Sequence, residues 1–86
     1  MDEIYSVEQR VIDIFSEVLK SPGEIDGDSD FFLSGGDSLL AGKVIVQVRT
    51  DFGVRVTLRQ LFNAATPREL AEVIAHSSVK APVQAE

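Results

Sequence analysis

The sequence predicts an all-α fold, a four-helix bundle with three longer helices, one short third helix and a long loop between the first two. Apolar residues recur at helical spacing in separate stretches, and serine or threonine caps precede several of them. The short alternating segment at residues 54–56 has no second strand with which to pair. We therefore expect one domain over residues 1–77 and a disordered tail over residues 78–86, which lack periodicity.

The first helix is expected over residues 6–19. Ser6 and Gln9 have the spacing of a capping box, in which each side chain bonds the backbone N–H of the other residue. The Ser-Pro-Gly sequence at residues 21–23 is a typical signal for the end of a helix. The apolar stripe of this helix comprises Val7, Val11, Ile14, Phe15 and Val18.

The loop over residues 20–37 is long for a segment without regular structure, and such loops are usually functional. It carries one lysine and five carboxylates, so its formal charge is −4. Four apolar residues are available to fix the loop to the core, and we expect at least two of them to be buried. They are Ile25, Phe31, Phe32 and Leu33.

The second helix is expected over residues 38–51, with Gly53 as the residue that ends it. Leu39, Gly42 and Val46 fall on a different face from its main apolar stripe. We interpret this second face as a surface for partner proteins, although single exposed apolar residues are common on any protein. The main stripe, which should face the core, comprises Leu40, Ala41, Val44, Ile45, Val48 and Phe52.

Two further capping signals start a short third helix over residues 58–63 and a last helix that ends near Ser77. In the short helix, Leu61 and Phe62 are expected to supply core, and Arg59 is expected to point outward. The apolar stripe of the last helix comprises Leu70, Ala71, Val73 and Ile74. The capping residues are Thr57 and Gln60 for the short helix, and Thr66, Pro67 and Glu69 for the last.

The composition limits the possible functions. A chain of 86 residues fits one small domain, and the absence of cysteine excludes disulfides and thiolate metal sites. Its net charge of −6 argues against non-specific binding to nucleic acid and favours partners with basic surfaces. The acidic N-terminus does not resemble a signal peptide, and no apolar run reaches the roughly 20 residues of a membrane span. We expect a cytoplasmic protein that does not bind membranes.

One stretch carries most of the functional information: Asp-Phe-Phe-x-x-Gly-Gly-Asp-Ser-Leu at residues 30–39. The two glycines allow a tight turn, and both Asp37 and Ser38 are good helix N-caps. Ser38 therefore lies at, or one residue inside, the start of a helix. Because such a terminus favours negative charge, we expect a phosphate-linked group on Ser38.

This stretch resembles the phosphopantetheine-attachment motif of carrier proteins. Gly-Gly-Asp-Ser-Leu is more similar to peptidyl carrier (thiolation) domains of non-ribosomal peptide synthesis than to fatty-acid acyl carriers, and the resemblance extends over about residues 6–76. It implies that Ser38 receives 4′-phosphopantetheine from coenzyme A and that the arm holds an amino or aryl acid as a thioester. The protein itself would be a non-catalytic carrier.

The resemblance also implies the partners: a phosphopantetheinyl transferase, an adenylating enzyme, and downstream condensing or tailoring enzymes. A free-standing monomer is expected, although an excised domain of a larger synthetase is also compatible with the sequence. Gly42 departs from the pattern, since a larger apolar residue four positions after the serine would anchor a partner. The residues expected to contact partners are Asp37, Leu39, Gly42, Lys43, Val46 and Arg59.

Parts of the sequence are also compatible with other functions. Within the class, the runner-up is an acyl carrier of polyketide or fatty-acid synthesis, and an interaction module without a prosthetic group is a further alternative. Gly-Asp-Ser-Leu at residues 36–39 is also the signature of a family of serine hydrolases. Those enzymes need a general base, and His76 is the sole histidine. It is not part of an Asp-x-x-His sequence, because the residue three positions before it is Val73. We expect His76 to be a helix-end residue.

The acidic run at residues 26–30 resembles the beginning of an EF-hand calcium loop. That loop requires glycine at its sixth position, where this chain has Phe31, and a bidentate glutamate at its twelfth, where it has Asp37. The sequence therefore favours a solvated acidic loop and no metal site.

Overall fold

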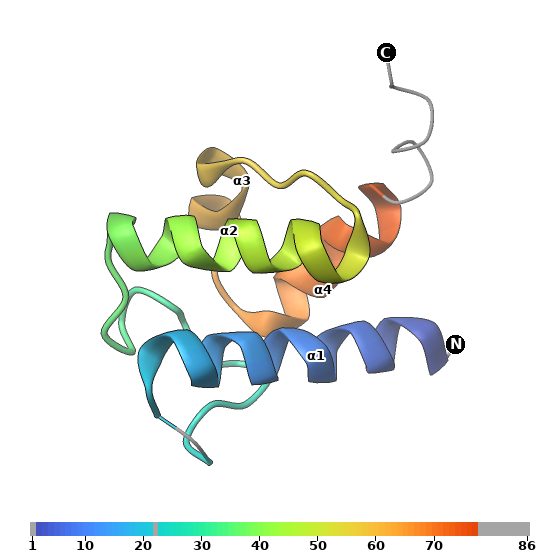
Figure 1. Cartoon of the computed structure of the whole chain (residues 1–86). Helices are drawn as coiled ribbons and strands as arrows, with labels where there is room; N and C mark the ends of the chain where they lie inside the picture. The colour runs from blue at the N-terminus through green and yellow to red at the C-terminus, as the bar shows by residue number, and fades with distance from the viewer. Residues whose placement is uncertain (1, 22, 78–86) are drawn as a thin grey trace.

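The structure is a computed structural model that describes residues 2–21 and 23–77. Within these residues it contains four helices and no strand: α1 (Asp2–Leu19), α2 (Ser38–Phe52), α3 (Leu58–Asn63) and α4 (Pro67–Ser77). The predicted all-α bundle, with a short third helix and a long first loop, is confirmed (Figure 1). The predicted tail over residues 78–86 lies outside the described residues.

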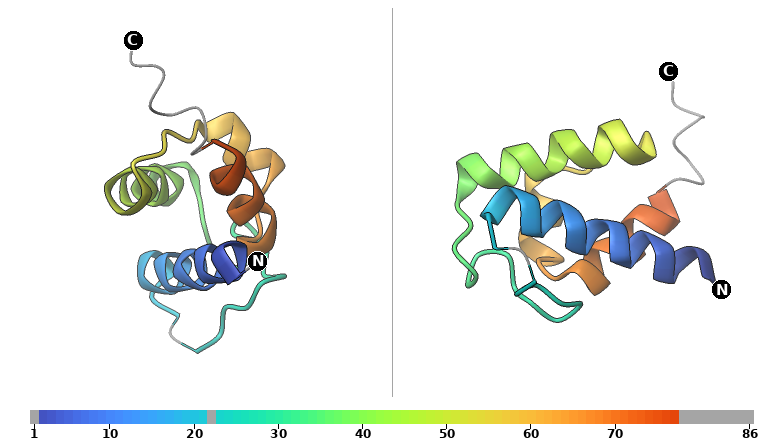
Figure 2. Two further views of the ribbon diagram at one scale, coloured as in Figure 1. Left: turned by 90° about the vertical axis from the view of Figure 1, so that its right-hand side faces the viewer. Right: turned by 60° about the horizontal axis from the view of Figure 1, so that its bottom comes forward.

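The helices form two layers. α1 and α2 lie side by side and run in opposite directions, so that the end of α1 and the start of α2 are at the same end of the molecule (Figure 1). α3 and α4 both lie on one side of this pair, with α4 packed against α1 and α3 packed against α2 (Figure 2). The long loop closes the end of the bundle where α2 begins.

The core lies between these layers. Every helix contributes buried apolar residues, although α3 contributes only one of the two that were predicted. Residues 54–56 add two buried valines in a segment that is neither helix nor strand. The described residues contain no buried charged or polar side chain. The largest buried side chains are Phe15, Phe31, Ile14, Leu61, Leu70 and Ile74.

The start of α1 differs from the prediction. The helix begins at Asp2, and Ser6 is an exposed residue inside it, so the capping box of Ser6 and Gln9 is wrong. Residues 2–5 contain neither glycine nor proline. Each residue added to a helix already formed contributes one backbone hydrogen bond. Because residues 2–5 include no helix breaker, α1 extends from Ser6 toward the N-terminus as far as Asp2.

The end of α1 has an unusual backbone conformation. Lys20 has a φ of 56°, in the left-handed region that glycine normally occupies after a helix. The N–H of Lys20 donates to the carbonyl of Glu17 at 3.3 Å, and the N–H of Ser21 donates to that of Ser16 at 3.0 Å. These two bonds form a Schellman motif, which ends the helix at Leu19, the predicted residue, before the Ser-Pro-Gly sequence begins.

Replacing Lys20 with glycine should stabilise the fold. The left-handed conformation costs a residue with a Cβ about 1–2 kcal/mol, and the greater freedom of glycine in the unfolded chain offsets part of that gain. We expect Lys20→Gly to raise the free energy of unfolding by about 0.5–1 kcal/mol in urea titrations. Lys20→Ala is the control, because it removes the same charge but keeps the Cβ, and a gain of equal size in that variant would contradict the explanation.

The starts of α3 and α4 confirm the predicted caps. Thr57 and Gln60 form a reciprocal capping box, with N···O distances of 2.9 and 3.1 Å. Thr66 Oγ1 accepts from the N–H of Glu69 at 3.1 Å, directly before the proline that begins α4. Phe62, however, was expected in the core and is 53% exposed. It follows the buried Leu61, and neighbouring residues of a helix point about 100° apart, so only one of them faces the core.

One fully buried aromatic residue anchors the long loop. Phe31 has no exposed surface, its ring meets that of Phe15 edge to face at 5.0 Å, and its N–H donates to the carbonyl of Ala65 at 2.8 Å. Ile25 and Phe32 are half-buried against the core. Leu33 is 88% exposed. Phe31 is thus the only one of these four residues that is buried, and the expectation that at least two would be buried was wrong.

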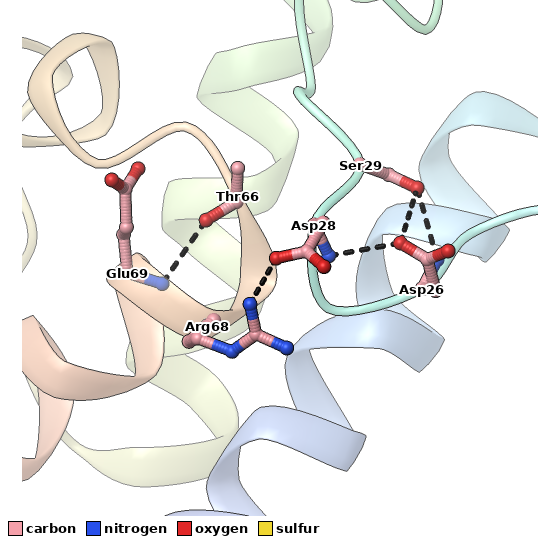
Figure 3. A network of polar contacts seen from close by, with 6 residues as sticks. All are labelled: Asp26, Asp28, Ser29, Thr66, Arg68 and Glu69. Atoms are coloured by element: carbon pink, nitrogen blue, oxygen red, sulfur yellow. Dashed lines mark hydrogen bonds and ion pairs between the residues drawn. The ribbon is translucent and has the colours of Figure 1, made fainter.

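Polar contacts fix the acidic half of the loop to the start of α4 (Figure 3). The side chain of Arg68 forms an ion pair with Asp28. The backbone N–H of Arg68 donates to the carbonyl of Gly27 at 3.1 Å. Asp26 Oδ1 accepts from the N–H of Asp28 at 2.8 Å and from Ser29 Oγ at 3.2 Å. The carboxylates that resemble an EF-hand thus bind the backbone, a serine and an arginine, and the described residues contain no group of three or more potential metal ligands.

Candidate functional site

Ser38 is the first residue of α2, and it is exposed. Its neighbour Asp37 is the cap: the carboxylate of Asp37 accepts from the N–H of Leu40 at 2.9 Å, and its carbonyl accepts from the N–H of Ala41 at 2.8 Å. The hydroxyl of Ser38 forms no hydrogen bond with another described residue. Although both residues are suitable caps by sequence, Asp37 alone does this work, and the serine oxygen stays available.

The two glycines before Asp37 are needed for different reasons. Gly35 has a φ of 111°, which a residue with a Cβ rarely adopts. Gly36 has an ordinary φ, but a Cβ there would collide with the ring of Phe31, and its N–H donates to the carbonyl of Phe31 at 2.9 Å. The turn that presents Ser38 is therefore built directly on the buried aromatic anchor of the loop.

A surface groove of about 590 Å³ runs beside Ser38, between the end of α1 and the outer face of α2. We call it the α1–α2 groove. It brings together four of the residues expected to contact partners. Sequence reasoning missed three others, two in the last turn of α1 and one directly after it. Its lining residues are Leu39, Gly42, Lys43, Val46 and Gln47 of α2, Glu17 and Val18 of α1, and Lys20.

Two of the expected partner residues lie outside the groove. Asp37 is the cap at the start of α2, and Arg59 is exposed on α3. A second apolar surface, also missed, joins the loop to α3: the rings of Phe32 and Phe62 stack at 4.7 Å with 17° between their planes. The Phe-Phe pair at residues 31–32 was the available signal in the sequence, but the contact of Phe32 with Phe62 depends on how the loop folds against α3.

The site does not support serine hydrolysis. His76 lies in the last turn of α4 and is exposed, and its Nδ1 is 2.9 Å from the carbonyl of Glu72. The last turn of α4 and the first turn of α2 are at opposite ends of the molecule (Figures 1 and 2). The sole histidine of the sequence is therefore a helix-end residue, as expected, and cannot act as a base for Ser38.

Comparison with known proteins identifies the family. The family model for the phosphopantetheine attachment site matches residues 9–74 of this chain. The chain belongs to this phosphopantetheine-attachment family. The solution structure of an active-site mutant of a peptidyl carrier protein is similar to this carrier domain, with a TM-score of 0.80 and 34% identity over 85% of this chain and 80% of the other.

A second similar structure is that of the phosphopantetheine transferase Sfp in complex with coenzyme A and a peptidyl carrier protein. The TM-score is 0.78 at 34% identity, over 81% of this chain and 90% of that one. The carrier domain is thus of the peptidyl type, its cofactor is 4′-phosphopantetheine, and the alternative of a polyketide or fatty-acid acyl carrier is not favoured. Carrier domains of this kind are generally non-catalytic.

Curated relatives are much longer proteins. Hybrid PKS-NRPS synthetase 1 of Dothistroma septosporum is 41% identical over 69 residues, which cover 80% of this chain and 2% of the synthetase. Surfactin synthase subunit 1 of Bacillus subtilis is 38% identical over 68 residues, which cover 79% of this chain and 2% of the subunit.

Across the described part of the carrier domain, no helix has the length and apolar character needed to cross a membrane.

Gly36→Ala should destabilise the carrier domain, because the added methyl group must displace the buried ring of Phe31. Overpacking of a filled site costs about 1–3 kcal/mol, and we expect a loss of this size in chemical denaturation. Gly42→Ala provides a comparison at a glycine whose Cβ position meets no atom within 4 Å. An unchanged stability in Gly36→Ala would contradict the proposed contact with Phe31.

Gly42→Ala should itself stabilise the domain. Gly42 lies inside α2 without a left-handed φ, and glycine within a helix costs about 0.5–1 kcal/mol relative to alanine. Urea denaturation should show a gain of this size. A loss of stability would contradict the open space seen above Gly42, and a gain accompanied by slower modification of Ser38 would indicate that a partner approaches this backbone closely.

Proposed function

We propose that Ser38 is the residue to which 4′-phosphopantetheine is attached and that the arm carries an amino or aryl acid as a thioester. The observation that supports this most directly is the free, exposed hydroxyl of Ser38 at the first position of α2, beside an aspartate that already caps the helix. Ser38 also occupies the serine position of the motif that resembles the family's attachment site.

The chemistry requires only an accessible hydroxyl on this chain. A phosphopantetheinyl transferase, with magnesium and coenzyme A, would make Ser38 Oγ attack the β-phosphate. An oxygen–phosphorus bond then forms, the serine proton is lost, and 3′,5′-adenosine bisphosphate leaves. The backbone N–H groups in the first turn of α2, together with the helix dipole, favour the negative charge of the resulting phosphodiester.

The chain has no cysteine, so the thiol that holds the acyl group must belong to the arm. An arm can also reach several active sites in turn, which a short side chain cannot do. Tethering raises the effective concentration of the acyl group at each partner. These requirements fit a carrier without catalytic activity of its own that functions as a single domain over residues 1–77 and as a monomer.

The proposed partners are the transferase, an adenylating enzyme, and condensing or tailoring enzymes of non-ribosomal peptide or related natural-product synthesis. The similar proteins, which include a surfactin synthase subunit and a peptidyl carrier protein in complex with a transferase, support this set. Asp37 and Leu39 would help the transferase to dock, and Gly42, Lys43, Val46 and Arg59 would serve later partners. Dependence on coenzyme A, an intracellular metabolite, supports the expected cytoplasmic location.

The test is intact-mass spectrometry after incubation with coenzyme A, magnesium and a promiscuous phosphopantetheinyl transferase. We expect one phosphopantetheine to be added to the wild-type protein and none to Ser38→Ala. Ser34→Ala is the matched control, because Ser34 is an exposed serine of the loop that precedes α2, and this variant should be modified normally. Absence of a mass gain on the folded wild-type protein, or a gain that persists in Ser38→Ala, would disprove the assignment.

A further inference from the structure

The α1–α2 groove combines an apolar lining with local positive charge. Its apolar residues are Val18, Leu39 and Val46, and Leu39 and Val46 are 73% and 58% exposed. At Gly42 no side chain covers the helix, and a Cβ there would meet no atom within 4 Å. A ligand that lies along α2 therefore reaches both the helix backbone and two exposed apolar side chains.

Both lysines of the described chain, Lys20 and Lys43, line this one groove. Neither forms an ion pair with a described residue, whereas the two ion pairs found among residues 2–21 and 23–77 use Arg10 and Arg68. Glu17 is the only carboxylate among the lining residues. On a protein whose net charge is −6, the groove is thus a local site of unpaired positive charge.

We propose that the α1–α2 groove binds a helix of a partner protein that presents apolar side chains flanked by carboxylates. The apolar side chains of that helix pack on Leu39 and Val46, and its carboxylates pair with Lys20 and Lys43. The identification of the partner as an enzyme that acts on the carrier rests on the proposed function, whereas the binding of such a helix does not.

The charge of the whole domain makes this proposal specific. General attraction to a protein of net charge −6 favours basic ligands, so a preference for an acidic helix arises only from charges at the groove itself. Exposed ion pairs contribute about 0.2–1 kcal/mol each, which corresponds to roughly a factor of 1.5–5 in affinity. The lysines therefore determine the register of the partner helix and the negative charge of its flanking side chains, and the apolar contacts supply most of the affinity.

The experiment is an NMR titration of the ¹⁵N-labelled carrier domain with synthetic helical peptides of about 20 residues. One peptide has a leucine face flanked by glutamates, and its match has lysines in place of the glutamates. We expect the glutamate peptide to shift the amide resonances of Val18, Gly42 and Val46, with an affinity that falls as salt rises. Equal or tighter binding of the lysine peptide at these positions, or shifts confined to other surfaces, would overturn the proposal.

Variants of the two lysines test the charge contacts. Lys20→Glu combined with Lys43→Glu should weaken binding of the glutamate peptide at least about fivefold. Arg55→Glu is the control, because Arg55 is exposed, lies outside the groove and undergoes the same reversal of charge. Circular dichroism checks that each variant is folded, and a loss of affinity in Arg55→Glu as large as in Lys43→Glu alone would contradict the assignment.

The phosphopantetheinylated protein distinguishes the partner helix from the domain's own arm. Its resonances at Gly42 and Val46 should match those of the unmodified protein and should still shift with the glutamate peptide. If modification alone moves these resonances and blocks the peptide, the arm occupies the groove and the proposal is wrong. Ser38→Ala should lack the arm, so its titration with the glutamate peptide measures binding to the groove alone. The result therefore does not depend on whether Ser38 is the residue that is modified.

Discussion

Burial of Phe31 is the interaction on which the presentation of Ser38 depends. The ring packs edge to face on Phe15 of α1, and its backbone joins the segment before α4 on one side and Gly36 on the other. Burial of a phenylalanine side chain contributes about 1.5–3 kcal/mol. A loop of formal charge −4 is thus held to the core next to the start of α2, although half of its residues have polar or charged side chains.

Asp37 and Ser38 divide two tasks that one residue could not perform together. A serine that caps a helix uses its oxygen to accept a backbone hydrogen bond, and that oxygen is the atom that we propose to react. Because Asp37 accepts the bond from Leu40, Ser38 begins the helix with a free hydroxyl. The order of these two residues explains how the N-terminus of α2 is capped while a serine hydroxyl beside the cap stays available for the proposed attachment.

Local signals in the sequence predicted three of the four helix starts and the attachment motif, because caps, glycines and apolar spacing act within a few residues. The errors arise where tertiary structure decides. Nothing local indicates that α1 extends back past Ser6, or which of Leu61 and Phe62 faces the core. The part of α1 in the groove was missed for the same reason, since Val18 and Lys20 meet α2 only when the two helices pack in opposite directions.

The α1–α2 groove is also where the sequence departs most from what stability favours. Lys20 adopts a backbone conformation that suits glycine, and Gly42 occupies a helical position that suits alanine. Each choice costs on the order of 1 kcal/mol, a substantial fraction of the stability of a small domain. Local choices that oppose stability are expected at functional sites. Here glycine at position 20 would remove a positive charge, and a side chain at position 42 would narrow the groove, so both costs are explained if the groove binds a partner.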